Sequence, residues 1–133
     1  MTPAHCAIAF ALLVSSAPGL AGAGEPERDA AREISHLLQY LEASKCAFYR
    51  NGVWHSSRQA RIHLKDKYKY LQGTSRVDSA EEFLARAATG SSISGAPYQV
   101  RCDGQQPVTS AKWLETELRR YRANISGKGA RLE

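Results

Sequence analysis

The stretch Cys46–Leu64 concentrates the side chains of this 133-residue chain that are best suited to chemistry. It contains an Arg50-Asn51 pair before a glycine, and the two histidines His55 and His63. Two histidines supply only part of a zinc site, which takes further cysteine, histidine or carboxylate ligands at short spacing. No acidic residue lies between them. We therefore expect no metal or other cofactor, and a hydrogen-bonded role for His63 in the core.

A second polar stretch, Ser91–Ser94 (Ser-Ser-Ile-Ser), precedes a glycine. A serine nucleophile needs a base and an oxyanion hole, and the Gly-x-Ser-x-Gly elbow is absent from the chain. A small hydrolase that uses a serine of this loop with His63 is therefore an alternative. A second interpretation is a loop whose backbone N–H groups bind an anion beside Arg50.

Aromatic residues near these stretches offer a further interpretation, a surface on which sugars stack. In a domain of this size, aromatic side chains more often form the core. The residues concerned are Tyr49, Trp54, Tyr98 and Trp113.

The first segment, Met1–Ala23, has no charged side chain and contains the apolar run Ala7–Val14. Residues 21–23 (Ala-Gly-Ala) form a small-x-small cleavage signature, so we expect a signal peptide cut before Gly24. The alternative is an uncleaved membrane anchor, for which the apolar run is short. The expected product is periplasmic or secreted, with no stable membrane insertion after cleavage. We expect one small helical domain over residues 24–126 and a flexible tail over residues 127–133.

The net charge of +5 favours anionic partners, and export argues against nucleic acid. Removal of residues 1–23 would leave Cys46 and Cys102 as the two remaining cysteines. An even pair in an exported chain predicts one disulfide, worth about 4 kcal/mol in the loop-entropy model. The alternative is two buried free thiols.

The elements that must position these side chains follow from hydrophobic spacing and from turn residues. Asn51-Gly52 predicts a hairpin between residues 46–49 and 53–54, and Tyr98–Cys102 alternates as a strand. A disulfide would place the two segments side by side. We expect a mainly α protein with a small β element (α+β), in which about four helices accompany an antiparallel two- or three-stranded sheet. The first helix is predicted over Ala30–Lys45. The second is capped by Ser56 and Gln59 and ends near Leu71. The third is capped by Asp78 or Ser79 and ends at Gly90, and the fourth is capped by Ser110.

Two segments, residues 48–68 and 79–100, resemble the YfeK-like family of short exported bacterial proteins, which carry a domain of unknown function. The resemblance covers about half of the expected mature chain. It implies export and this fold, and brings no catalytic activity or cofactor. The matching positions are Arg50, Asn51, Gly52, His63, Leu64, Ser91, Ser92, Ser94, Gly95, Pro97 and Tyr98.

These observations favour a non-enzymatic exported module that binds an unknown envelope protein or a small anionic ligand. The hydrolase is one alternative, and a purely structural module is another, in which the polar residues brace the hairpin against the loop. The predicted binding residues are Arg50, Asn51, His55, His63, Ser91, Ser92, Ser94 and Tyr98.

Overall fold

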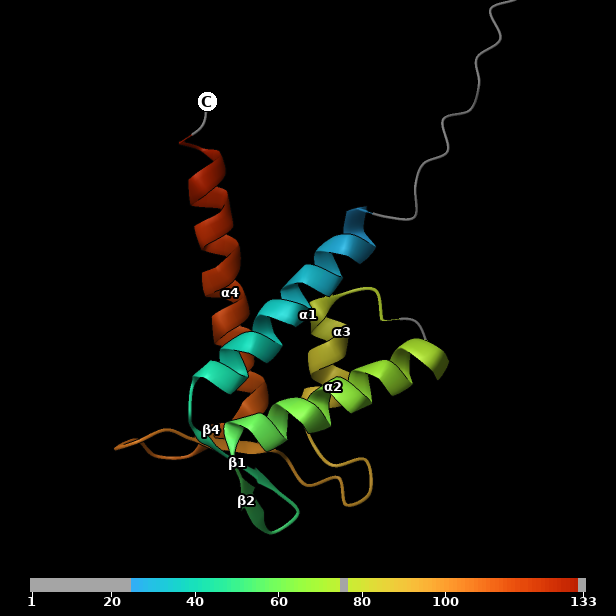
Figure 1. Cartoon of the computed structure of the whole chain (residues 1–133), viewed down its shortest axis with the longest axis vertical. Coiled ribbons are helices and arrows are strands. Elements are labelled where there is room, and N and C mark those ends of the chain that lie inside the picture. The colour runs from blue at the N-terminus through green and yellow to red at the C-terminus, as the bar shows by residue number, and fades with distance from the viewer. Residues whose placement is uncertain (1–24, 75–76, 132–133) are drawn as a thin grey trace, which may run out of the picture.

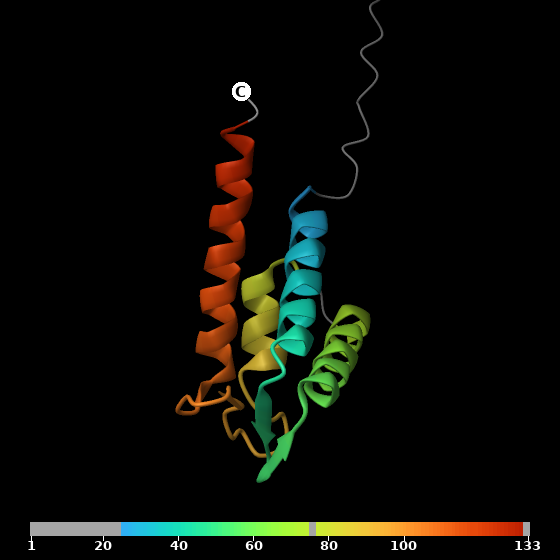
Figure 2. The same cartoon turned by 60° about the vertical axis from the view of Figure 1, so that its left-hand side comes forward.

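The computed structural model describes residues 25–74 and 77–131, so the predicted signal peptide and its cleavage point lie outside the described residues. It contains a four-stranded antiparallel sheet of order β2-β1-β3-β4 and a set of helices that stand on it (Figures 1 and 2). The strands are β1 (Ala47–Arg50), β2 (Val53–His55), β3 (Gln99–Arg101) and β4 (Val108–Thr109). The helices are α1 (Glu25–Ala43), α2 (Ser57–Thr74), α3 (Ala80–Phe83) with its π-helical continuation η1 (Leu84–Ala88), and α4 (Ser110–Gly129).

The expected fold class is confirmed, and the sheet has one strand more than predicted. The extra strand, β4, is only two residues long and pairs through Val108 with Val100 of β3. Two residues are too few to show the alternation of apolar and polar side chains by which a strand is recognised in a sequence.

Helix α1 supplies the centre of the core and packs against α2, α3 and α4. Its apolar stripe consists of Ile34, Leu37, Leu38 and Leu41, all of which are buried. Opposite it lie Phe83 and Leu84 of the α3–η1 segment, Leu114 and Leu118 of α4, and Leu64 of α2. A helix of this length is only marginally stable on its own in water, so burial of the apolar stripe stabilises α1 more than its helix propensity does.

The hairpin forms as the Asn-Gly pair predicts. Asn51 has φ +48° and Gly52 has φ +86°, the positive values that a two-residue hairpin turn requires. Ser56 then caps α2: the Gln59 N–H donates to Ser56 Oγ at 3.2 Å, and the Ser56 N–H donates to Gln59 Oε1 at 3.0 Å. The predicted capping box is therefore confirmed.

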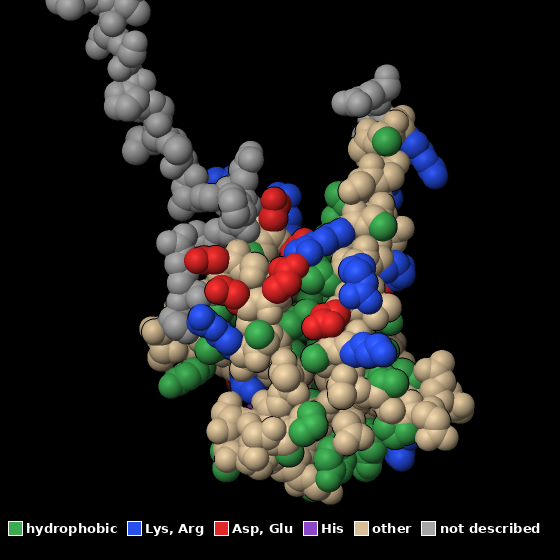
Figure 3. Space-filling view, turned by 180° about the vertical axis from the view of Figure 1, so that it is seen from behind, with side chains coloured by type: hydrophobic (Ala, Val, Ile, Leu, Met, Phe, Trp, Pro, Cys, Tyr) green, Lys and Arg blue, Asp and Glu red, His purple; other side chains and the backbone are tan. Residues whose placement is uncertain are grey.

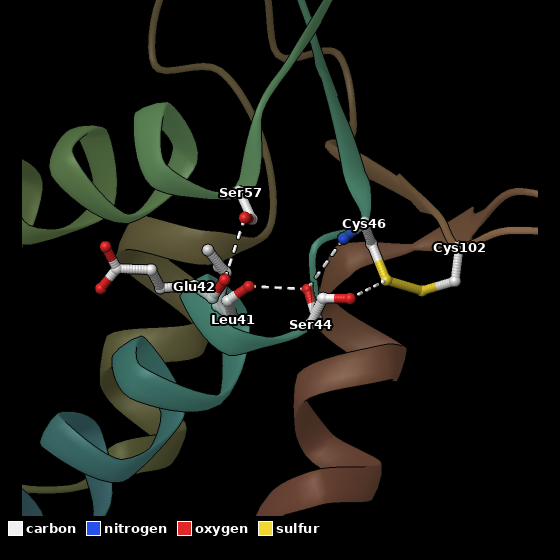
Figure 4. Close-up of a disulfide and its surroundings, with 6 residues drawn as sticks. All are labelled: Leu41, Glu42, Ser44, Cys46, Ser57 and Cys102. Carbon is white, nitrogen blue, oxygen red and sulfur yellow. Dashed lines mark hydrogen bonds between the residues drawn. A yellow bond between two sulfur atoms is a disulfide. The ribbon is translucent and has the colours of Figure 1, made fainter.

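The predicted disulfide between Cys46 and Cys102 is confirmed (Figure 4). In the register of β1 and β3, Ala47 pairs with Arg101, so the two cysteines occupy the next antiparallel position. Figure 4 shows the bridge beside the end of α1, where Ser44 Oγ donates to the Leu41 carbonyl at 2.6 Å. The bridge joins the lead-in of the hairpin to the end of β3.

Helix α4 corrects two predictions. Its N-cap residue is Thr109, and Ser110 is the first helical residue, with its side chain turned into the protein. Ile125, in the last part of the helix, is 52% exposed. Beyond Arg122, the end of α4 stands clear of the other helices in Figure 1, so Ile125 has no helix to pack against. The helix also continues beyond residue 126 to Gly129.

Arg122 connects the middle of α4 to α1 and α3. Its guanidinium donates to Glu33 of α1 at 2.7 and 2.8 Å and to Glu81 of α3 at 2.5 and 3.2 Å. Figure 3 shows basic and acidic side chains facing one another across this side of the molecule. The ion pairs are mostly exposed, so they orient the helix more than they stabilise it.

Candidate functional site

Polar side chains from three separate segments meet on one side of α2. Arg50, the last residue of β1, places Nη1 3.3 Å from Nδ1 of His63. The other ring nitrogen of His63, Nε2, lies 3.1 Å from Oη of Tyr98. Lys67, one turn further along α2, donates from Nζ to Tyr98 Oη at 3.3 Å and to the Gly90 carbonyl at 3.1 Å. These contacts connect the hairpin, α2 and the loop before β3.

The partners of His63 determine where its proton sits. A guanidinium only donates, so Nδ1 must accept from Arg50, and the neutral ring then donates from Nε2 to Tyr98. Burial, followed by the nearby charges of Arg50 and Lys67, lowers the pKa of His63 to about 4. His63 is thus neutral at pH 7, as this arrangement of hydrogen bonds requires.

The two cations of the site lack carboxylate partners among the described residues. Arg50 forms a hydrogen bond with His63, and Lys67 forms bonds with a phenol and a carbonyl. Burial, then the charge of Arg50, lowers the pKa of Lys67. Two half-buried cations close to one another, without a counter-ion, are the arrangement that a bound anion would stabilise.

A pocket of about 380 Å³ opens beside these groups, between the hairpin and α2. Its floor consists of Leu41, Phe48 and Leu64, all buried. Polar side chains surround the floor: Arg50, His55, Gln59, His63, Asp66 and Tyr98. The volume falls in the range of small-molecule sites, and so does the combination of an apolar lining with a few converging polar groups.

Ser110 also lines this pocket. It is 3% exposed, and its Oγ is buried without a hydrogen-bond partner. Buried hydroxyl groups almost always have a partner. Sequence reasoning assigned Ser110 to capping α4 and so missed it as a pocket residue.

The serine loop is built mainly by its own hydrogen bonds. Ser91 is buried, and its Oγ accepts from the N–H groups of Ile93 and Ser94 at 3.2 and 3.3 Å. Ser94 Oγ donates to Asn51 Oδ1 at 2.8 Å, which ties the loop to the hairpin turn. Ser92 lines a separate hollow of about 320 Å³ that also includes His63 and Lys67.

The loop closes tightly at Gly90. A Cβ there would lie 2.8 Å from the carbonyl oxygen of Ala96, so only glycine fits without a shift of the backbone. The Ser91 N–H donates to the same carbonyl at 3.0 Å, and the Tyr98 N–H donates to the Thr89 carbonyl at 3.0 Å. This closure fixes the backbone of Tyr98, which is 7% exposed and presents its hydroxyl to His63.

The structure thus brings together part of the predicted binding set. Arg50, His55, His63 and Tyr98 line the main pocket. Asn51 and Ser94 are hydrogen-bonded to each other, and Ser91 accepts hydrogen bonds from N–H groups of its own loop. Ser92 lies in the neighbouring hollow.

Lys67 was missed as a site residue, although it follows His63 by one helical turn and therefore lies on the same face of α2. A lysine on a core-facing stripe is unusual, and this was the signal that could have found it.

The proposed aromatic surface is not continuous. Tyr49 packs against Trp54 at a ring distance of 5.3 Å. Trp113 instead contacts Tyr40 and Phe48 at ring distances of 4.7 and 5.7 Å. Tyr98 contacts His63, so the four residues do not form one surface.

Within residues 25–74 and 77–131, no group of three or more His, Cys, Asp or Glu side chains has the arrangement of a metal site. In the same residues, no helix has both the length and the apolar character needed to cross a membrane.

Fold and site together define a small α+β domain, cross-linked by one disulfide, with a pocket lined by Arg50 and an adjoining hollow lined by Lys67. The chain belongs to the Family of unknown function (DUF5329), which residues 28–122 match. It is 35% identical over 94 residues to the uncharacterized protein YfeK of Salmonella typhimurium, covering 70% of this chain and 72% of that protein. The YfeK-like resemblance of the sequence is thereby confirmed. No solved structure matches the chain.

Proposed function

We propose that this protein is an exported, non-enzymatic module that binds a small anion beside Arg50, His63 and Lys67. The observation that carries the proposal is the pair of cations without a carboxylate partner in the described residues. Arg50 lines the main pocket, Lys67 lines the neighbouring hollow, and His63 lines both. After burial, the charges of Arg50 and Lys67 lower the pKa of His63, and the carboxylate of Asp66 raises it by less, so the field of the cations dominates beside His63. A negative group placed there would interact favourably with both charges.

The donors available at this point suit an anion. Arg50 has five N–H donors, of which one is used by His63. Tyr98 Oη accepts from His63 and Lys67, so its own proton remains for an acceptor in the pocket. A carboxylate or phosphate oxygen is the acceptor that such charge-assisted donors bind most strongly.

Export is the second part of the proposal. The disulfide between Cys46 and Cys102 supports it, since disulfides persist in oxidising compartments and are rare in the cytosol. A tagged full-length chain should yield a mature protein that begins at Gly24, with the disulfide intact. Recovery of the protein with residues 1–23 still attached, from a cytosolic fraction, would refute export.

A serine hydrolase is less well supported by the geometry. Catalysis of that kind needs a base in contact with the nucleophile. Both ring nitrogens of His63 are engaged by Arg50 and Tyr98. None of the loop serines forms a hydrogen bond with His63 among the described residues. A fluorophosphonate probe should therefore leave Ser91, Ser92 and Ser94 unlabelled.

The anion site can be tested with inorganic phosphate, by its effect on the melting temperature at constant ionic strength. At ten times its dissociation constant, phosphate would stabilise the folded protein by about 1.4 kcal/mol. We expect Arg50→Gln and Lys67→Gln to lose most of this shift. Arg58→Gln is the matched control, because Arg58 lies on α2, is exposed and does not line the pocket. Equal shifts in wild type and Arg50→Gln would refute the site.

A spectroscopic reading separates binding at this site from binding elsewhere. A phosphate held by Arg50 and Lys67 would offset the charges that lower the pKa of His63. In an NMR titration, that pKa should therefore rise when phosphate is added. An unchanged pKa of His63, together with a thermal shift, would place the phosphate at a different surface.

A further inference from the structure

We infer that the ligand is an amphipathic organic anion, whose negative group lies at Arg50 and Tyr98 and whose apolar body fills the slot between β1 and α2. This inference rests on the proposed anion site and names the class of molecule that the site takes. It depends on the shape and lining of the pocket, which the charges alone do not determine.

The slot has an apolar wall on each side. Leu41 and Phe48 contribute from α1 and β1, and Ala60, Ile62 and Leu64 contribute from α2. Leu41, Phe48 and Leu64 are already buried, so the apolar surface that an inorganic anion would leave facing water belongs mainly to Ala60 and Ile62. A ligand with an apolar body would remove that surface from water, at about 25 cal/mol for each Å² buried.

Ile62 marks the rim of the slot. It lines the pocket and is 53% exposed, although it is a large apolar side chain. An apolar side chain half exposed beside a hollow can be covered by a ligand that extends out of it. Its position thus extends the apolar wall from the buried floor toward solvent.

The size of the pocket agrees with this class. A cavity of about 150 Å³ holds benzene. The volume here is about 380 Å³, so a body of about six to eight carbons fits together with a carboxylate.

The inner wall also carries the unpaired hydroxyl of Ser110. A buried hydroxyl without a partner is costly, and a ligand group or an ordered water that reached Ser110 Oγ would remove that cost. This observation is independent of the cations, because Ser110 lies at the start of α4 and contacts neither of them in the described structure.

Calorimetric titration of the full chain with octanoate, acetate and 1-octanol tests the inference, with inorganic phosphate run in parallel. We expect octanoate to bind at least tenfold more tightly than acetate and than 1-octanol. Ile62→Ser should weaken octanoate about fivefold, through loss of apolar contact, and leave phosphate unchanged. Ile93→Ser is the matched control, because Ile93 is 95% exposed and lies outside the pocket lining.

A second variant tests the charge without disturbing α2. Gln59 lines the pocket and completes the capping box, and a glutamate serves that cap equally well. Gln59→Glu should therefore keep the melting temperature of the free protein and weaken octanoate and phosphate together. Unchanged affinity for both anions in a folded Gln59→Glu protein would overturn the anion site.

The outcomes separate the two proposals. Equal affinities for octanoate and acetate would overturn the amphipathic ligand and leave the anion site standing, as would phosphate binding without octanoate binding. Equal affinities for octanoate and 1-octanol would overturn both proposals, because the cations would then contribute nothing. Binding of neither octanoate nor phosphate would also overturn both.

Discussion

The imidazole of His63 and the phenol of Tyr98 meet across 35 residues of sequence, with Nε2 and Oη 3.1 Å apart. Their rings lie edge to face, with centroids 5.9 Å apart. The contact joins α2 to the loop that leads into β3, beside the pocket. It also assigns a role to Tyr98 that is separate from its packing in the core.

Replacement of this phenol tests the contact directly. In Tyr98→Phe, His63 and Lys67 both lose an acceptor, so we expect the free energy of unfolding to fall by about 1–2 kcal/mol. Urea denaturation at pH 7 measures the change. Tyr70→Phe is the control, since Tyr70 is 69% exposed and should change stability by less than about 0.5 kcal/mol. Equal stability of Tyr98→Phe and wild type would show that the hydroxyl contributes nothing.

The stability of the protein should depend on pH through His63. Its pKa is about 4 in the folded protein, below the ordinary value of 6.5. Between these values the unfolded chain binds a proton that the folded chain does not, so stability falls as the pH drops from 6.5 toward 4. Allowing for solvent screening, we expect a loss of about 1 kcal/mol between pH 7 and pH 5. Urea denaturation of wild type and His63→Gln at both pH values measures this contribution.

The variant should show a smaller loss of stability over this interval than wild type. The interval also lies above the range in which carboxylates titrate, so their protonation contributes little. The same pH dependence in His63→Gln and in wild type would mean that other groups cause it.

Replacement by alanine should change the stability of the protein very differently at Ser91 and at Ser92. Ser91→Ala removes the buried hydroxyl that accepts from two backbone N–H groups of its loop, so we expect a loss of about 1–2 kcal/mol in the free energy of unfolding. Ser92→Ala is its control, because Ser92 is exposed and should change stability by less than about 0.5 kcal/mol. Chemical denaturation of both variants measures the difference, and similar losses would contradict the assigned roles.

Removal of the disulfide should cost the most stability. The bridge joins residues separated by 56 positions, for which loop entropy predicts about 4 kcal/mol. The Cys46→Ala/Cys102→Ala variant should therefore unfold at a much lower urea concentration than the oxidised protein. The intact mass of the oxidised wild type should increase by about two daltons on reduction. A loss below about 1 kcal/mol in the variant would show that the closed loop adds little.

Much of the fold could be predicted from the sequence, because local signals determined it. Asn51-Gly52 indicates a hairpin turn, since both residues tolerate positive φ. The Ser56–Gln59 pair gives the start of α2, and the paired cysteines give the bridge between β1 and β3. Each signal acts within a few residues or through a covalent bond, so no knowledge of the remaining fold is needed.

The candidate site was predictable only in part. The sequence indicated Arg50, His63 and Tyr98, and the structure shows that they touch. That Lys67 and Ser110 also lie beside these residues could be seen only in the tertiary structure. Helical spacing shows which face of a helix a residue occupies, but not which segment packs opposite that face. Whether a lysine meets a carboxylate or a second cation depends on how distant segments pack. The tertiary structure therefore determines that Arg50 and Lys67 lack carboxylate partners among the described residues, and it forms the pocket. These two features together carry the proposed function.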